Sequence, residues 1–256
     1  MQIDLNCDMG ESFGAYRIGN DEALMPLITS ANIACGFHAG DAQVMAQTVA
    51  LALKHNVAIG AHPGFLDLQG FGRRNLDATP AEIENEVLYQ IGALSAFARA
   101  RGAQLAHVKA HGALYNLAAE KIEIARAIAR GIARFDSKLV MVALANSVMV
   151  DAARENNLRV AREGFCDRAY NRDGTLRPRR EPNAVIHDPA RAAQQALQIA
   201  REKTVTTPEG EIISLEADTL CIHGDNVAAV EIARAVREIL ARKGIAIRAM
   251  TVDDGR

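Results

Sequence analysis

Short apolar runs alternate with helix-like stretches along almost the whole of this chain. Strands that alternate with helices pair in parallel through right-handed crossovers, and a long series of such units closes into a barrel. The sequence therefore predicts one domain over residues 1–256, a TIM-like (β/α) barrel with seven or eight parallel strands. The predicted strands lie at residues 2–7, 31–35, 57–61, 105–110, 139–144, 159–163, 219–223 and 245–250.

Several helix boundaries carry recognisable signals. Residues 79–82 read Thr-Pro-Ala-Glu, a capping box with proline at the first helical position. Asp41 and Asp188 precede two further helices as N-caps, and Gly102 and Gly244 stand where helices should end. These signals separate the predicted strands with helices of ordinary length.

Three segments interrupt the strand–helix rhythm. Residues 203–217 contain two short β-prone runs around a Pro-Glu-Gly turn, which predicts a hairpin inserted before the seventh strand. Residues 63–78 and 164–187 are long for strand-to-helix connections and are rich in Gly and Arg. Long loops inside a compact domain are usually functional.

Composition narrows the function classes. The chain has 256 residues, 49% of them hydrophobic, which suffices for a sizeable core. A net charge of -2 provides no basic field, so nucleic acid is not expected as a partner.

The start carries Asp4 and Asp8 where a signal peptide would be apolar, and runs such as 139–145 are too short to span a bilayer. We expect a cytoplasmic protein with no membrane partner.

The cysteines show no metal-binding or redox spacing. No CxxC pair occurs, so we interpret the cysteines as reduced thiols rather than zinc ligands or disulfides. They are Cys7, Cys35, Cys166 and Cys221.

Four of the apolar runs end with a histidine near glycine. The stretches read NIACGFHAGD at 32–41, GAHPG at 60–64, VKAHGAL at 108–114 and CIHGD at 221–225. The carboxyl ends of the strands form the active-site face of (β/α) barrels. The four histidines are therefore expected around one site.

Sorting each strand into its two faces collects polar residues toward the barrel axis. A single inward histidine is more often a hydrogen-bonded core residue than a catalyst. Burying an unpaired polar group costs about 1–3 kcal/mol, however, so a whole polar set favours function over filling. Asp4 and His107 lie deeper than the others and serve equally well as structural supports. The inward set is Asp4, Asn6, Asp8, Asn32, His62, His107, Lys109, His111, His223 and Asp225.

The cofactor question stays open at this stage. His107 and His111 lie about 13 Å apart along a strand, so both cannot bind one ion. Metal ligands would have to come from different strands, for example Asp8 with His38 and His62. The chain has neither GxxxxGK[ST] nor GxGxxG, so an autonomous nucleotide site is unsupported.

The two long loops contain several arginines. Arginine binds carboxylates and phosphates through two parallel hydrogen bonds. Arg73, Arg74 and Arg168 stand beside Gly-rich or acidic turns near strand ends, which makes them candidates for an anionic substrate. The remaining loop arginines, Arg172, Arg177, Arg179 and Arg180, are less favourably placed, and the last three fit a solvated loop.

These motifs resemble the LamB/YcsF family. The matching blocks are DLNCDMGESFG, NIACGFHAGD, GAHPGFLDLQGFGRR, HVKAHGALYN, REGFCDRAYNRDGTLRPR and CIHGDN, and they run from Asp4 to about Asn226. Ala110 stands where the family usually has proline. The resemblance implies a barrel related to those of polysaccharide deacetylases. It also implies the A subunit of an ATP-dependent 5-oxoprolinase, which opens the lactam 5-oxoproline to glutamate together with subunits B and C.

The resemblance also guides the site assignment. Asp8, His38 or His62 is the candidate general base, and Lys109 would stabilise developing negative charge. His111, or Asp225 with His223, would protonate the leaving nitrogen. The predicted substrate-binding residues are Asn6, Asn32, Arg73, Arg74, Glu163, Asp167 and Arg168.

ATP is expected to be bound by the complex, and this chain need not touch it. Two rival interpretations are a metal-dependent amide hydrolase of the deacetylase kind and a non-catalytic protein that delivers substrate to its partners.

Overall fold

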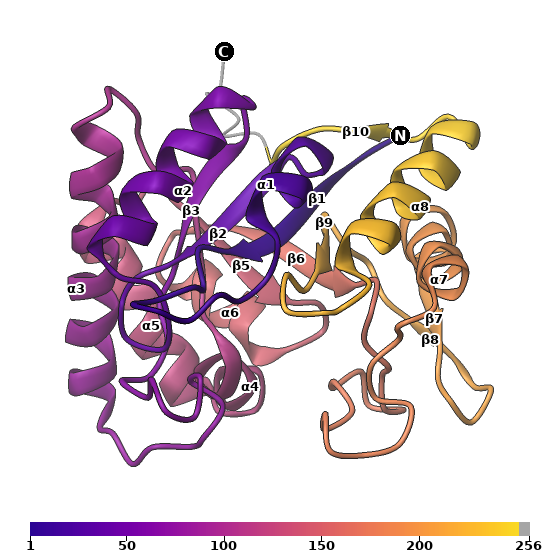
Figure 1. Ribbon diagram of the computed structural model, residues 1–256. Coiled ribbons are helices and arrows are strands. Elements are labelled where there is room, and N and C mark those ends of the chain that lie inside the picture. The colour runs from indigo at the N-terminus through magenta and orange to yellow at the C-terminus, as the bar shows by residue number, and fades with distance from the viewer. Residues whose placement is uncertain (251–256) are drawn as a thin grey trace.

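Seven parallel strands close into a barrel in the computed structural model, which describes residues 1–250 (Figure 1). Around the barrel, each strand pairs with the barrel strand that follows it in the sequence, and the last strand pairs with the first. The predicted TIM-like barrel is confirmed. Its strands are β1 (Gln2–Met9), β2 (Ser30–Ala34), β3 (Ala58–His62), β4 (His107–Lys109), β5 (Val140–Leu144), β6 (Arg159–Phe165) and β9 (Thr219–Ile222).

The closure explains why the barrel has seven strands rather than eight. β9 pairs directly with β1, from Asp4 opposite Thr219 to Cys7 opposite Ile222. The predicted eighth strand is the short β10 (Ala246–Ile247), which pairs with Gln2 and Ile3 at the start of β1. β10 lies where β9 does not reach and is too short to enter the barrel wall.

Helices cover the outside of the barrel between successive strands (Figure 1). The Thr79 capping box is present, and Asp41 and Asp188 cap their helices through side-chain hydrogen bonds to backbone N–H groups. The helices are α1 (Asp21–Leu24), α2 (Ala42–Lys54), α3 (Pro80–Arg99), α4 (Gly112–Glu120), α5 (Ile122–Phe135), α6 (Val148–Glu155), α7 (Pro189–Glu202) and α8 (Ala229–Arg242), with one 3₁₀ turn, η1 (Met25–Leu27).

The hydrophobic core lies between the strands and this helical layer. Ile3, Leu5 and Cys7 of β1 are buried there, on the face that alternation assigns to the helices. An antiparallel hairpin, β7 (Thr204–Thr206) and β8 (Ile212–Ser214), follows α7 and lies beside it at the edge of the molecule (Figure 1). Within residues 1–250, no helix combines the length and apolarity needed to cross a bilayer.

Candidate functional site

A cavity of about 400 Å³ opens at the carboxyl ends of the strands. Asp8, Lys109, His62 and His111 line its inner part, and they come from β1, β3 and the β4–α4 segment. The cavity is also lined by Arg73, Arg168, His223 and Asp225. The structure thus brings together most of the residues that the strand-end pattern predicted for one site.

Lys109 is the centre of what we call the lysine cluster, which comprises Asp8, Lys109, Glu163 and Cys221. The Lys109 ammonium lies 2.9 Å from Asp8 Oδ1, 2.9 Å from Glu163 Oε1 and 3.0 Å from Cys221 Sγ. Burial alone would lower the Lys109 pKa, but its anionic neighbours, Asp8 foremost, raise it well above its usual value. Lys109 is therefore a permanent buried cation.

Asp8 is held as a carboxylate by the same cluster. Burial acts to raise the Asp8 pKa, but His62 and Lys109 outweigh it and hold that pKa well below its usual value. Asn32 Nδ2 also donates to Asp8 Oδ1 at 2.9 Å. A fixed anion next to a fixed cation on the cavity wall can orient a polar substrate.

Asn6 and Asn32 form a layer beneath the cavity instead of binding substrate as predicted. Both are fully buried and neither lines the cavity. Asn6 donates to Glu163, and Asn32 donates to Asn6 Oδ1 and accepts from His107 Nε2 at 2.8 Å. Their amide groups hydrogen-bond to buried residues and hold the carboxylates of Glu163 and Asp8 in position.

Gly60 makes the space for His107. A Cβ at position 60 would lie only 2.1 Å from His107 Nε2. Burial lowers the His107 pKa to about 3, so the ring is neutral at ordinary pH. Asp4 lies deeper still and accepts from Thr29, Ser30 and Thr219. The structure assigns both residues to the support of the barrel rather than to the cavity.

Glu163 also lies under the cavity rather than on its wall. It is fully buried, and Tyr115 on α4 donates its hydroxyl to Glu163 Oε2 at 2.6 Å. The predicted substrate-binding role therefore does not fit Glu163, which serves to fix Lys109. Tyr115 escaped the sequence analysis because face-sorting was applied to strands, and this residue sits on a helix.

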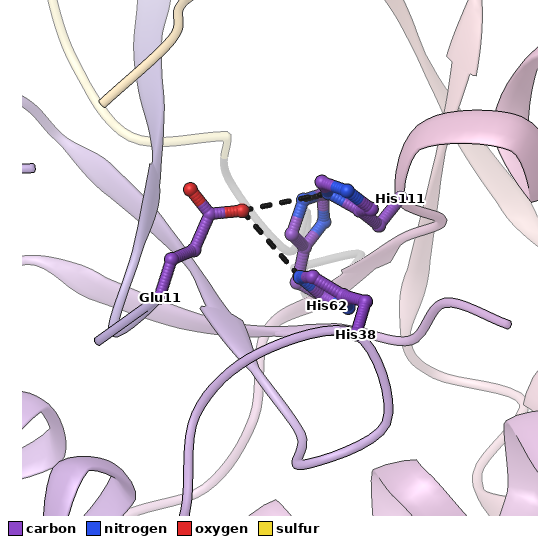
Figure 2. Close-up of side chains that lie close together, drawn as sticks. All are labelled: Glu11, His38, His62 and His111. Atoms are coloured by element: carbon purple, nitrogen blue, oxygen red, sulfur yellow. Dashed lines mark hydrogen bonds and ion pairs between the residues drawn. The ribbon is translucent and has the colours of Figure 1, made fainter. Parts of the chain in front are cut away.

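Beside the lysine cluster lies the histidine cluster, which comprises Glu11, His38, His62 and His111 (Figure 2). Glu11 Oε1 is 3.4 Å from His38 Nε2 and 3.5 Å from His111 Nδ1, and His111 Nδ1 is 2.9 Å from His62 Nε2. One ligand atom from each of the four residues lies within 4.8 Å of the other three. This geometry could hold a metal ion.

Burial shapes the charges in this cluster. It raises the Glu11 pKa well above its usual value, with further help from Asp8 and Asp225. It lowers the pKa of His38 and of His111 well below theirs, and neighbouring histidines add to the effect. His38 and His111 are therefore neutral, which is the form that binds metals.

His38 does not reach the cavity. Its side chain is completely buried, its ring stacks on that of His111 with centroids 3.7 Å apart, and Gly64 and Gly72 press against it. Gly36 and Gly40 have positive φ angles, so they provide the tight turn that carries His38 inward. His38 is therefore poorly placed for the predicted role of general base toward a cavity ligand.

Glu11 was missed because the strand alternation breaks just before it. Alternation along β1 would place Glu11 on the same outward face as Leu5 and Met9. Gly10 adopts φ +67°, which redirects the chain and turns Glu11 toward the histidines. The glycine between two acidic residues in the stretch DMGE was the available signal.

A carboxylate–imidazole pair lies next to the lysine cluster. Asp167 Oδ1 is 2.8 Å from His223 Nδ1, and Asp167 Oδ2 accepts from the backbone N–H of His223 and from Asn226. The charge of His223 and these hydrogen bonds outweigh burial and lower the Asp167 pKa. Asp167 is fully buried and orients His223 rather than binding substrate as predicted.

Arginines cover the mouth of the cavity. Arg73 pairs with Asp225 at 2.6 Å, and its guanidinium lies over the Phe71 ring. Arg168 donates to the backbone carbonyls of Ala184 and Arg177, and burial together with nearby Arg179 lowers its pKa to about 10. Arg73, Arg168 and Arg179 all line the cavity, so the solvated-loop interpretation of Arg179 does not hold.

Arg74 is not part of the site. Its guanidinium is bound by Asp67, its side chain is 60% exposed, and it does not line the cavity. The predicted substrate contact therefore does not fit Arg74.

The cysteines are all buried and unpaired, as the sequence predicted. Cys221 Sγ contacts the Lys109 ammonium.

Comparison with known proteins gives concordant full-length matches. The model described as "LamB/YcsF family" matches residues 3–254. The chain is 56% identical to a Bordetella parapertussis protein named as the A subunit of 5-oxoprolinase, over 96% of this chain and 98% of that one. It is 52% identical to the protein of the same name from Pyrococcus furiosus, over 98% of each chain.

A solved structure agrees with this result. The crystal structure of a "Lactam Utilization Protein" from Thermus thermophilus superposes with a TM-score of 0.92. It is 50% identical in sequence and covers 98% of this chain and 100% of that one.

Proposed function

The chain belongs to the LamB/YcsF family, and from that premise we propose that it is the A subunit of an ATP-dependent 5-oxoprolinase and works in the cytoplasm. The proposed reaction opens the lactam ring of 5-oxoproline to give L-glutamate, coupled to hydrolysis of ATP. The proposed partners are subunits B and C. Four free cysteines fit a reducing compartment.

The cavity carries this proposal. It presents Lys109 at its inner wall and Arg73, Arg168 and Arg179 at its mouth, in a chain whose full-length relatives are named as components of 5-oxoprolinase. 5-Oxoproline has one carboxylate and one lactam carbonyl. Arginines at the mouth suit the carboxylate, and a lysine further in suits a carbonyl oxygen that gains negative charge.

Each remaining role follows from a contact. Hydrolysis adds the oxygen of water to the lactam carbon, breaks the C–N bond and delivers a proton to the ring nitrogen. Asp8, a carboxylate beside Lys109, orients the water. His223 delivers the proton: Asp167 holds its Nδ1, which leaves Nε2 to exchange a proton with the substrate.

ATP is assigned to the complex rather than to this chain alone. The sequence has no phosphate-binding glycine loop, and a stable lactam needs chemical activation before water can attack it. In the proposal, ATP activates the lactam oxygen within the assembled complex. The cavity of this chain then completes the hydrolysis.

The test is conversion of 5-oxoproline to glutamate with ATP, measured for this chain with and without subunits B and C. We expect glutamate only with the complete set, and less than about one hundredth of that rate when Lys109→Ala replaces the wild-type chain. Lys203→Ala is the matched control, since it removes an exposed lysine. No glutamate from the complete wild-type set would reject the proposal.

The histidine cluster favours one second candidate, a metal-dependent amide hydrolase. That enzyme would not need ATP. Glutamate or another amine product formed by this chain in the absence of ATP, and abolished by a chelator, would favour it over the first proposal.

A further inference from the structure

The hydrogen bonds of His62 and His111 fix where their lone pairs point. His62 Nδ1 lies 2.8 Å from the backbone carbonyl of Lys109, and His111 Nε2 lies 2.8 Å from that of Phe71. A carbonyl oxygen only accepts, so each of these nitrogens carries the N–H. The other nitrogens, His62 Nε2 and His111 Nδ1, therefore bear lone pairs when the rings are neutral.

Those two lone pairs face each other at close range. His62 Nε2 and His111 Nδ1 are 2.9 Å apart, and in the neutral form of each ring neither nitrogen carries a proton. Two acceptors at this distance repel unless a positive species lies next to both. Donation from the other nitrogen to a backbone carbonyl is also the usual arrangement around metal-bound histidines.

Unpaired buried atoms complete the same locus. Among residues 1–250, Glu11 Oε1 and both ring nitrogens of His38 are buried without a hydrogen-bond partner. Leaving such atoms unpaired costs about 1–3 kcal/mol each. Glu11 Oε1 and His38 Nε2 face each other at 3.4 Å and adjoin the His62–His111 pair, so one cation could satisfy Glu11 Oε1 and His38 Nε2 together.

The distances match a tetrahedral site. Zinc bonds to nitrogen and oxygen of about 2.0–2.2 Å place neighbouring ligand atoms about 3.3 Å apart in a tetrahedron. Three of the six separations among the ligand atoms are 2.9 Å, 3.4 Å and 3.5 Å, and all six lie within 4.8 Å. We propose that Glu11, His38, His62 and His111 bind one divalent ion of the zinc class. Binding itself does not depend on the proposed substrate or on ATP.

A proton bound by His38 or His111 is a poorer occupant than a metal ion. The rings of His38 and His111 are parallel with centroids 3.7 Å apart, so a positive ring would face a second buried imidazole. A divalent ion instead takes all four donors at once. Three neutral imidazoles and a carboxylate without thiolate suit zinc, whereas calcium and magnesium prefer oxygen ligands.

The neighbouring group of Asp8, Cys221 and His223 does not make a second site. Its potential ligand atoms also lie close together, but the Lys109 ammonium is within 3.0 Å of both Asp8 and Cys221. A lysine cation there takes the place that a metal would need.

The inferred ion adjoins the cavity. Glu11, His62 and His111 line its wall, and His62 Nε2 is 3.5 Å from Asp8 Oδ1. His38, His62 and His111 are then ligands, and the acid–base roles predicted for them do not apply. Proton transfer then falls to His223.

The experiment is metal analysis of the full chain in the absence of substrate. The purified protein is stripped with a chelator, incubated with zinc or cobalt(II), and freed of excess metal. We expect one ion per chain, intense visible absorption of four-coordinate cobalt, and a rise in Tm on adding zinc back.

Variants locate the ion. His38→Gln should lose it, and Glu11→Gln should bind it at least tenfold more weakly. His55→Gln, at the end of α2 and outside the cluster, is the matched control and should bind like wild type. The proposal is overturned if the reconstituted wild type holds no stoichiometric ion, or if a folded His38→Gln chain binds as well as wild type. If His38→Gln does not fold, the Glu11→Gln affinity decides.

The two proposals fail separately. Absence of the ion leaves the ATP-dependent assay as the test of the lactam-opening activity. Absence of glutamate leaves the cobalt spectrum unchanged.

Discussion

The lysine cluster and the histidine cluster lie side by side at the same end of the barrel, yet they are neutralised in opposite ways. In the first, the ammonium of Lys109 contacts Asp8, Glu163 and Cys221. In the second, Glu11 Oε1 and the His38 ring nitrogens find no partner within residues 1–250. Buried polar groups need a counterpart, so the chain supplies the cation itself on one side and requires one from solution on the other.

Removing the internal cation should have the largest effect. Lys109→Met leaves the Asp8 and Glu163 carboxylates buried without their cation, which should destabilise the fold by about 3–5 kcal/mol. Urea unfolding measures it. Lys203→Met, which breaks an exposed pair with Glu216, should cost less than about 1 kcal/mol. If both variants lost the same unfolding free energy, Lys109 would contribute no more to stability than an exposed lysine does.

Arg73 lines the cavity and should matter for substrate binding. It pairs with Asp225 on one side and lies over Phe71, whose carbonyl binds His111, on the other. Losing one charge-assisted contact of about 1.5–3 kcal/mol predicts that Arg73→Ala raises KM about 10–100-fold. Steady-state kinetics of the complex would measure this change. Arg74→Ala, outside the cavity, should leave KM unchanged, and a similar rise there would contradict the assignment.

Gly60 tests the layer that supports both clusters. The Cβ of Gly60→Ala would overlap the His107 ring, so we expect about 1–3 kcal/mol of destabilisation and a weaker hold on Asn32. Gly92→Ala is the matched control: its Cβ meets nothing within 4 Å inside α3, and stability should rise by up to about 1 kcal/mol. Thermal unfolding of both variants decides. If Gly60→Ala left the stability unchanged, the His107 ring would be free to move away from the added Cβ.

His107 should also make the fold sensitive to acid. His107 has a folded pKa of about 3 against an ordinary 6.5, so between these values the unfolded chain binds a proton that the folded chain refuses. Stability therefore falls as pH falls, by up to about 1.4 kcal/mol per pH unit from this group, with no contribution well above pH 6.5. His107→Gln should flatten the dependence of unfolding free energy on pH across that window. If the unfolding free energies of wild type and His107→Gln changed with pH in the same way, His107 would not be held neutral in the folded chain.

The sequence predicted the polar interior of the barrel, but it did not predict which polar residues face the cavity and which ones support them. Strand alternation correctly collected Asp8, His62, Lys109 and His111 around one axis. It could not tell residues that face the cavity from residues that hold them, because both types point inward. Alternation therefore predicted Asn6 and Asn32 as substrate ligands, whereas the Asn32 amide donates to Asn6 and to Asp8.

Residues outside the strands were beyond this reasoning. Tyr115 reaches Glu163 from a helix, and Glu11 follows a glycine with positive φ that ends the alternation. Arg74 and Arg73 are neighbours in one loop, and nothing in their order indicates that Asp67 binds one and Asp225 the other. Such choices depend on contacts between segments far apart in the chain.

By itself, the sequence determined the barrel, its helix caps and the end at which the site forms, since these depend on periodicity and local backbone preferences. Only the tertiary structure decided which polar groups pair with one another. His38 is the clearest case: its place near a strand end could be read in the sequence, while its burial between His111 and Glu11 came from packing. Pairing is a matter of ångströms across the barrel, and that distance is fixed only when the strands close.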